Sequence, residues 1–111
     1  GVHIGDLDGA AGGNKSAWSA SVTVAVHGSN HSATPSAVVT GTWGGAASGS
    51  GTCTTGAGGT CQLSASNLRK RDASATFTVT GITASGATYL SGQNHDVDGS
   101  STGTTVVIAK P

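Results

Sequence analysis

The chain has 111 residues, a length that suits one domain and not two. Charged residues make up only 9% of it, against about a quarter in typical proteins, and the formal net charge is zero. This balance argues against nucleic acid and against an anionic membrane surface as partners, because both require clustered Lys and Arg. No apolar run is long enough for a transmembrane helix.

The chain opens with GVHIGDLDG, which does not read as a signal peptide. We therefore expect a mature or excised piece of a larger parent protein. The first clear strand covers residues 17–28, where apolar and polar residues alternate with a period of two. Its apolar positions are Trp18, Ala20, Val22, Val24 and Val26. A turn follows, and His27 and His31, in or beside it, are expected to be exposed.

A second strand is predicted over residues 37–43 and ends at Trp43. The small residues at 44–51 predict a loop or an irregular edge. Residues 52–64 hold two short β-prone arms around Gly56, Gly58 and Gly59, a pattern that predicts a hairpin.

Alternation returns at residues 73–83, which predict another strand, and residues 87–90 suggest a short one. The apolar run at 103–109 predicts a strand that is buried on both sides or central in its sheet. Seven or so short strands separated by turn signals predict a single all-β domain over 1–111, an antiparallel β-sandwich, with a small barrel as the alternative.

The two tryptophans, Trp18 and Trp43, suit a hydrophobic core. The alternative is an exposed aromatic platform for a ligand, which would display them together with Tyr89 on one flat patch.

Cys53 and Cys61 flank the Gly-rich centre of the predicted hairpin, so a cross-strand disulfide between them is sterically plausible. Free thiols are the alternative. The spacing matches no zinc signature. A disulfide would place the protein in an oxidising compartment and predicts a secreted protein.

Four aspartates are candidates for a metal site. They occur in two copies of the motif D-x-D-G, which contain Asp6 with Asp8 and Asp96 with Asp98. Such a pair projects to one side of an extended segment or wraps around a centre in a tight loop, and oxygen ligands of this kind suit Ca²⁺. Asn94 could add a carbonyl oxygen. If the copies converge, their mutual repulsion requires a cation. Ordinary turns are the alternative, as is a transition-metal site that includes His3 and His95.

Catalysis is not expected, because no G-x-S-x-G elbow is present and few aromatic residues remain to line a sugar cleft beside the Asp pairs. A small hydrolase is therefore the weakest hypothesis. We expect no enzyme activity.

Residues 18–68 are similar to bacterial Ig-like repeats, with AVVTGTW matching A-x-V-x-G-x-W and a T-x-x-x-G-x-C stretch after it. Together with VHIGDLDG and NHDVDG, the whole chain resembles the Ig-like accessory domain found near the C-terminus of secreted bacterial hydrolases, notably subtilisin-like serine peptidases. It departs from the commoner pattern in two turns, at 56–59 and 27–37. The peptidase triad lies on another domain and is not carried over.

The resemblance implies an Ig-like sandwich that acts as a non-catalytic accessory module of a secreted multidomain exoenzyme. Its expected roles are to attach, space or stabilise the catalytic domain of the same parent chain, with Ca²⁺ as a stabilising ion. The alternative is a specific binding domain for an insoluble polysaccharide or a collagen-like extracellular protein.

Overall fold

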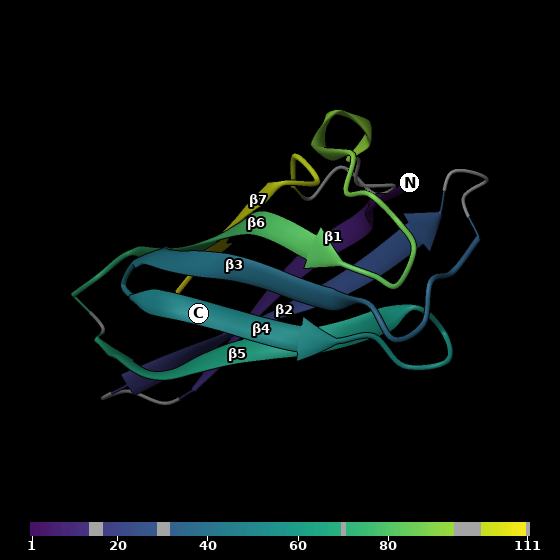
Figure 1. Ribbon diagram of the computed structural model, residues 1–111. Coiled ribbons are helices and arrows are strands. Elements are labelled where there is room, and N and C mark those ends of the chain that lie inside the picture. Colours follow the sequence, from purple (N-terminus) through teal and green to yellow (C-terminus); the bar gives the residue numbers. More distant parts are fainter. Residues whose placement is uncertain (14–16, 29–31, 70, 95–100, 111) are drawn as a thin grey trace.

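The computed structural model, which describes residues 1–13, 17–28, 32–69, 71–94 and 101–110, is a sandwich of two antiparallel β-sheets (Figure 1). The first sheet has the order β1-β2-β5, formed by β1 (Val2–Gly13), β2 (Ala17–Gly28) and β5 (Thr60–Arg69). The second has the order β4-β3-β6-β7, formed by β3 (Val38–Gly45), β4 (Gly49–Thr54), β6 (Ser74–Thr83) and β7 (Thr105–Ala109).

The strand order confirms the predicted all-β, Ig-like sandwich of about seven strands, of which the described part of the chain forms seven. Neighbours such as β2 and β5, or β3 and β6, are not consecutive in sequence, which is the Greek-key connectivity of Ig-like sandwiches. The fourth strand pairs with β3, whereas in constant-type Ig domains it joins the sheet of the fifth strand. One short 3-10 helix, η1 (Ser91–Gln93), completes the described structure, in which no helix is long and apolar enough to cross a membrane.

The core lies between the sheets and follows the predicted alternation. Every second residue of β2, from Trp18 to Val26, is buried, and β6 alternates in the same way around Phe77. The Phe77 ring lies over the backbone of Gly41, where a Cβ would overlap it, and packs against Trp43 with ring centroids 5.0 Å apart. Burial of each large apolar side chain stabilises the fold by about 1.5–3 kcal/mol.

Strand β1 was not predicted. Its sequence is rich in Gly and Asp, residues that are depleted in strands. A register shift between Ile4 and Asp6 marks a bulge at Gly5, so Ile4 and Leu7 both reach the core although they are three residues apart. The bulge breaks the period of two that would have identified the strand.

The hairpin predicted over residues 52–64 is wrong. The first arm belongs to β4, which forms a hairpin with β3, and the second begins β5, which pairs with β2 in the opposite sheet. The Gly-rich residues between them carry the chain from one sheet to the other. Gly59 has φ of 76° and donates its N–H to the Gly56 carbonyl at 2.9 Å, which closes the crossing turn.

Three further expectations need correction. Strand β7 lies at the edge of its sheet, not in its centre, and Val107 is 62% exposed. The apolar run predicted the strand correctly, but it did not reveal that this strand has a neighbour on one side only. Residues 87–90 form no strand of their own, and Tyr89 makes an isolated parallel bridge to Val2. The predicted loop at 44–51 already contains the start of β4.

Candidate functional site

The first carboxylate pair lies on the outer face of the β1-β2-β5 sheet. Asp6 and Asp8 flank the fully buried Leu7 in β1, so both side chains project to the same, outward side. Asp6 Oδ1 also accepts a hydrogen bond from the Leu7 N–H at 3.0 Å. Of the two geometries expected for D-x-D-G, the first pair therefore adopts the extended one.

Asn94 joins three separate segments. Its Oδ1 accepts a hydrogen bond from the Ile4 N–H at 2.8 Å, and its Nδ2 donates to Tyr89 Oη at 2.6 Å and to Thr104 Oγ1 at 3.0 Å. The amide oxygen that we expected to serve a metal ion thus already holds the backbone of β1. Asn94 has a structural role that its sequence context did not reveal.

The contacts of Asn94 also bear on whether the two acidic pairs converge. Asn94 and Thr104 bracket residues 95–103 and contact each other, and Asn94 contacts β1 two residues before Asp6. Further along, a Cβ at Gly9 would meet the Ile108 side chain, so β1 and β7 run close together. Both flanks of the second D-x-D-G copy therefore lie along β1. His95, Asp96 and Asp98 themselves lie outside the described residues, and the described ones contain no group of three His, Cys, Asp or Glu suited to a metal.

The histidines are placed differently from the prediction. His3, expected at the surface or beside a metal ion, is only 1% exposed, and His27, expected to be exposed, is half-buried. They are cross-strand partners between β1 and β2, and their rings meet edge to face with centroids 5.9 Å apart. The bulge residue Gly5 permits this contact, because a Cβ there would overlap the His27 ring. His31 lies outside the described residues.

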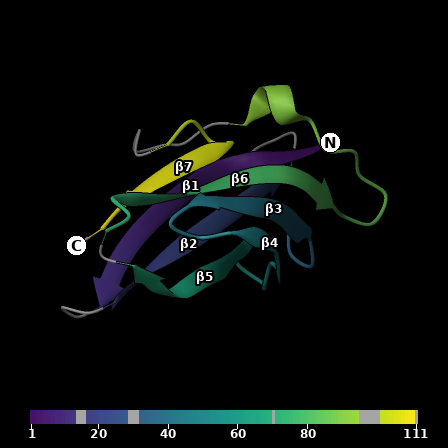
Figure 2. The ribbon, with the colours of Figure 1, turned by 90° about the vertical axis from the view of Figure 1, so that its left-hand side faces the viewer.

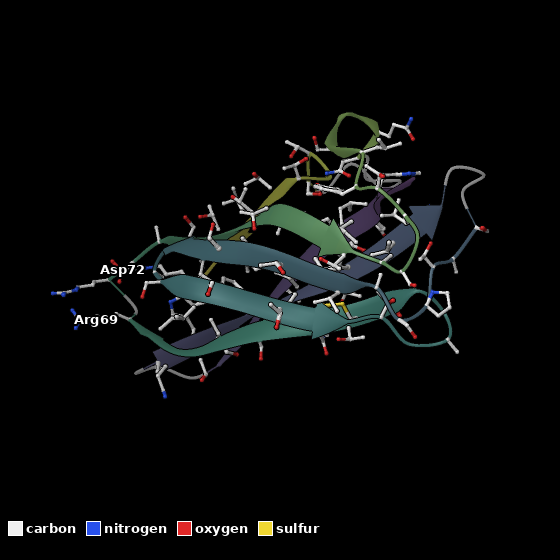
Figure 3. All side chains as sticks on the ribbon, viewed as in Figure 1. Arg69 and Asp72 are labelled. Carbon is white, nitrogen blue, oxygen red and sulfur yellow. A yellow bond between two sulfur atoms is a disulfide. The ribbon has the colours of Figure 1, made fainter. Side chains whose placement is uncertain are left out.

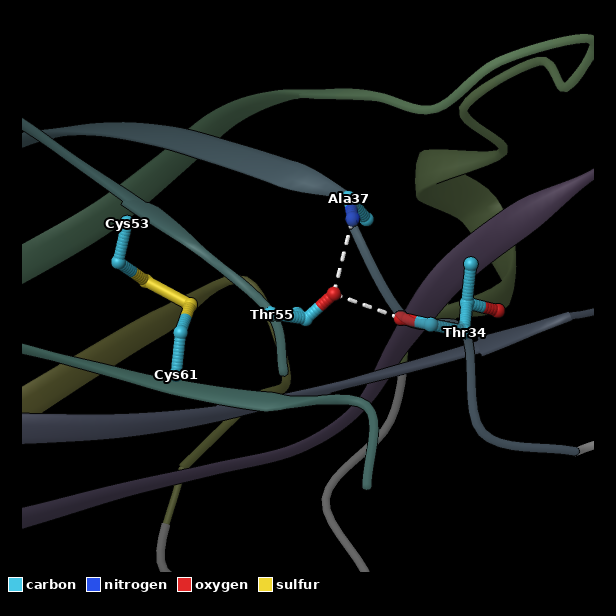
Figure 4. The surroundings of a disulfide bond; sticks show 5 residues. All are labelled: Thr34, Ala37, Cys53, Thr55 and Cys61. Atoms are coloured by element: carbon cyan, nitrogen blue, oxygen red, sulfur yellow. Dashed lines mark hydrogen bonds between the residues drawn. A yellow bond between two sulfur atoms is a disulfide. The ribbon is translucent and has the colours of Figure 1, made fainter. Parts of the chain in front are cut away.

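The predicted disulfide between Cys53 and Cys61 is present, with a Cα–Cα distance of 5.8 Å (Figure 4). Because β4 and β5 are edge strands of opposite sheets, the disulfide closes one side of the sandwich and does not brace a hairpin. Beside it, the buried Thr55 Oγ1 accepts a hydrogen bond from the Ala37 N–H at 2.8 Å and donates one to the Thr34 carbonyl at 2.7 Å (Figure 4).

The three aromatic residues considered as a ligand platform do not share a patch. Trp18 is 1% exposed in the core and its Nε1 donates to the Arg69 carbonyl at 3.1 Å, so it is not available to a ligand. Trp43 is half-buried on β3, and Tyr89 is half-buried beside Asn94. Trp18 is therefore a core residue, as its place in an alternating strand indicates.

Comparison with known proteins yields no relationship. No family model matches the chain, and no curated protein and no solved structure matches it significantly.

Proposed function

We propose that the chain is a non-catalytic accessory module of a secreted bacterial multidomain exoenzyme, and that it connects and spaces neighbouring domains. The observation that carries this proposal is the position of its two ends. Gly1 lies against Leu90 at one pole, and Lys110 donates its N–H to the Ala73 carbonyl at the other (Figure 2). The molecule is elongated, with extents of 44 × 23 × 20 Å. A module that the chain enters at one pole and leaves at the other holds its neighbours in line.

The surface supports a connector more than a ligand site. The described residues enclose no cavity or cleft, and their aromatic side chains lie in the core or, like Trp43 and Tyr89, are half-buried against it. Small-molecule sites are usually concave and lined by apolar and aromatic groups. The disulfide across the open side of the sandwich supports an oxidising, extracellular setting, where such bonds persist.

Calcium is part of the proposal. Asp6 and Asp8 stand on one face of β1, and the residues on both sides of the second D-x-D-G copy are held along the same strand. If Asp96 and Asp98 complete the cluster, a hard divalent cation would offset the repulsion among four carboxylates. The ion would then tie the segment before β7 to the first strand.

Cosedimentation and turnover separate this function from its rivals. The purified chain is mixed with cellulose, chitin and fibrillar collagen, and is assayed on model esters and glycosides. A connector stays in the supernatant and turns over nothing. Retention on one of these solids that is lost on Tyr89→Ala would favour the binding-domain alternative, and turnover that is lost on Asp98→Asn would favour a hydrolase.

A further inference from the structure

We infer that the free edge of β7 is a docking surface for a second copy of this chain, which pairs with it strand to strand. The backbone of β7 is satisfied on one side by β6. The Thr104 carbonyl accepts from the Val79 N–H at 2.8 Å, and the Lys110 N–H donates to the Ala73 carbonyl at 3.0 Å. Because backbone groups alternate in direction along an antiparallel strand, Thr105, Val107 and Ala109 direct theirs away from β6.

One of these three residues, Thr105, already has hydrogen-bond partners within the chain for its outward-directed backbone groups. Thr105 donates its N–H to Thr102 Oγ1 at 2.9 Å, and its carbonyl accepts from the Thr102 N–H at 3.2 Å. Val107 and Ala109 have no such partner among the described residues. Each offers one N–H and one C=O at the outer edge of the sheet, where β7 is the last strand (Figure 2).

Among the residues that the structure describes, β7 carries no charge and no bulge, which are two of the devices that normally prevent strand pairing. Edge strands are protected by charges, bulges or covering segments. β1 carries Asp6, Asp8 and a bulge, and β4 and β5 are bridged by the disulfide. β7 reads TVVIA and pairs with β6 without a register shift. Its Val107 is, among the residues that the structure describes, the one large hydrophobic side chain that is exposed, at 62%.

The charge of the sheet as a whole is compatible with pairing to the same sheet of a second copy. None of β3, β4, β6 and β7 contains a charged residue, so a second copy brings no like charges together within the strands. The far half of β1, residues 9–13, is also an edge, but it consists of Gly and Ala, which pair weakly as strands. The β-branched residues of β7 favour pairing there.

One antiparallel register satisfies all the open groups. With Ile108 opposite the partner's Ile108, Val107 faces the partner's Ala109, and each such pair exchanges both of its N–H···O bonds. Val107 then covers the partner's Ala109 on the outer face, and Lys110 faces the partner's Val106 and not another lysine. The two-fold axis closes the assembly as a dimer with one continuous sheet across both copies.

Sedimentation equilibrium combined with amide hydrogen exchange tests this proposal on the intact chain. Over micromolar to millimolar concentrations we expect a monomer–dimer equilibrium, and we expect slower exchange at the Val107 and Ala109 amides as the fraction of dimer rises. A mass that stays monomeric throughout would overturn the proposal. So would a dimer in which these two amides exchange at the monomer rate.

Variants locate the interface. Val107→Lys places a charge at the edge, and Ala109→Pro removes an N–H that β6 does not use, so each should weaken dimerisation at least tenfold with unchanged melting of the monomer. Thr42→Lys, on the exposed outer face of β3, and Ala11→Lys, on the edge of β1, are matched controls that should dimerise normally. Loss of the dimer in either control, but not in Val107→Lys, would place the contact elsewhere and contradict the proposal.

Discussion

The side-chain oxygen of Asn94 accepts a hydrogen bond from the backbone N–H of Ile4 at 2.8 Å, across 90 residues of sequence. The same amide group donates to Tyr89 and Thr104, so one side chain fixes β1 against the two segments that flank residues 95–100. Asn94 therefore ties β1 to the described residues on either side of that segment.

Replacing Asn94 by Ala should lower the free energy of unfolding by roughly 1–3 kcal/mol, because the Ile4 N–H loses its partner. Urea denaturation followed by tryptophan fluorescence measures the change. Tyr89→Phe removes only one of the three bonds and should cost less. Ser91→Ala, an exposed residue nearby, is the control and should be neutral. Equal stability of Asn94→Ala and Ser91→Ala would show that the Asn94 bonds do not hold these segments.

Removing the disulfide with Cys53→Ser and Cys61→Ser together should destabilise the fold by about 2.5 kcal/mol, the chain-entropy value for so short a loop. Reduction of the wild-type protein with dithiothreitol should produce the same loss, while the double variant should not respond to the reductant. A double variant as stable as the wild type would mean that β4 and β5 stay together without the covalent link.

Thr55→Val keeps the shape of the side chain but leaves the Ala37 N–H and the Thr34 carbonyl without their hydroxyl partner. Since these groups lie in or near the core, we expect a loss of about 1–3 kcal/mol in unfolding free energy. The neighbouring Thr54 is exposed on β4, so Thr54→Val serves as the matched control. Similar denaturation midpoints for the two variants would contradict this role of Thr55.

Calcium should raise the melting temperature, and a chelator should lower it, because an ion that binds only the native state stabilises it by linkage. A concentration 100 times the dissociation constant would add about 2.7 kcal/mol, which corresponds to a shift of several degrees. Asp8→Asn and Asp98→Asn should each abolish the response, whereas Asp72→Asn, in the turn after β5 (Figure 3), should retain it. Scanning calorimetry that shows the same melting with calcium and with chelator would exclude the ion.

The sequence was sufficient to predict the strands that have one apolar and one polar face. Trp18 to Val26 and Ala75 to Val79 alternate because one face of each strand meets the core, and both strands were found where predicted. β1 escaped prediction because the bulge at Gly5 shifts the alternation and its carboxylates suggested loops.

Other errors concern long-range partners, which local patterns do not encode. Glycines 56–59 mark a turn equally well whether the next strand folds back on the same sheet or crosses to the other one. In the same way, a TVVIA run is apolar whether it lies in the centre of a sheet or at its edge, so the exposure of Val107 could not be read from it. Asn94 is a further case, because its partners include the Ile4 backbone, 90 residues away in the sequence.

The central claim is that the module holds its neighbours apart at opposite poles, and energy transfer between two fluorescent proteins fused to its ends tests it most directly. We predict low transfer with a narrow distance distribution, since the ends are separated along the 44 Å axis of a folded sandwich. A Gly/Ser linker of equal length is the control and should give a broad distribution. A distribution for the module as broad as that of the linker, or high transfer from ends that lie together, would contradict the account.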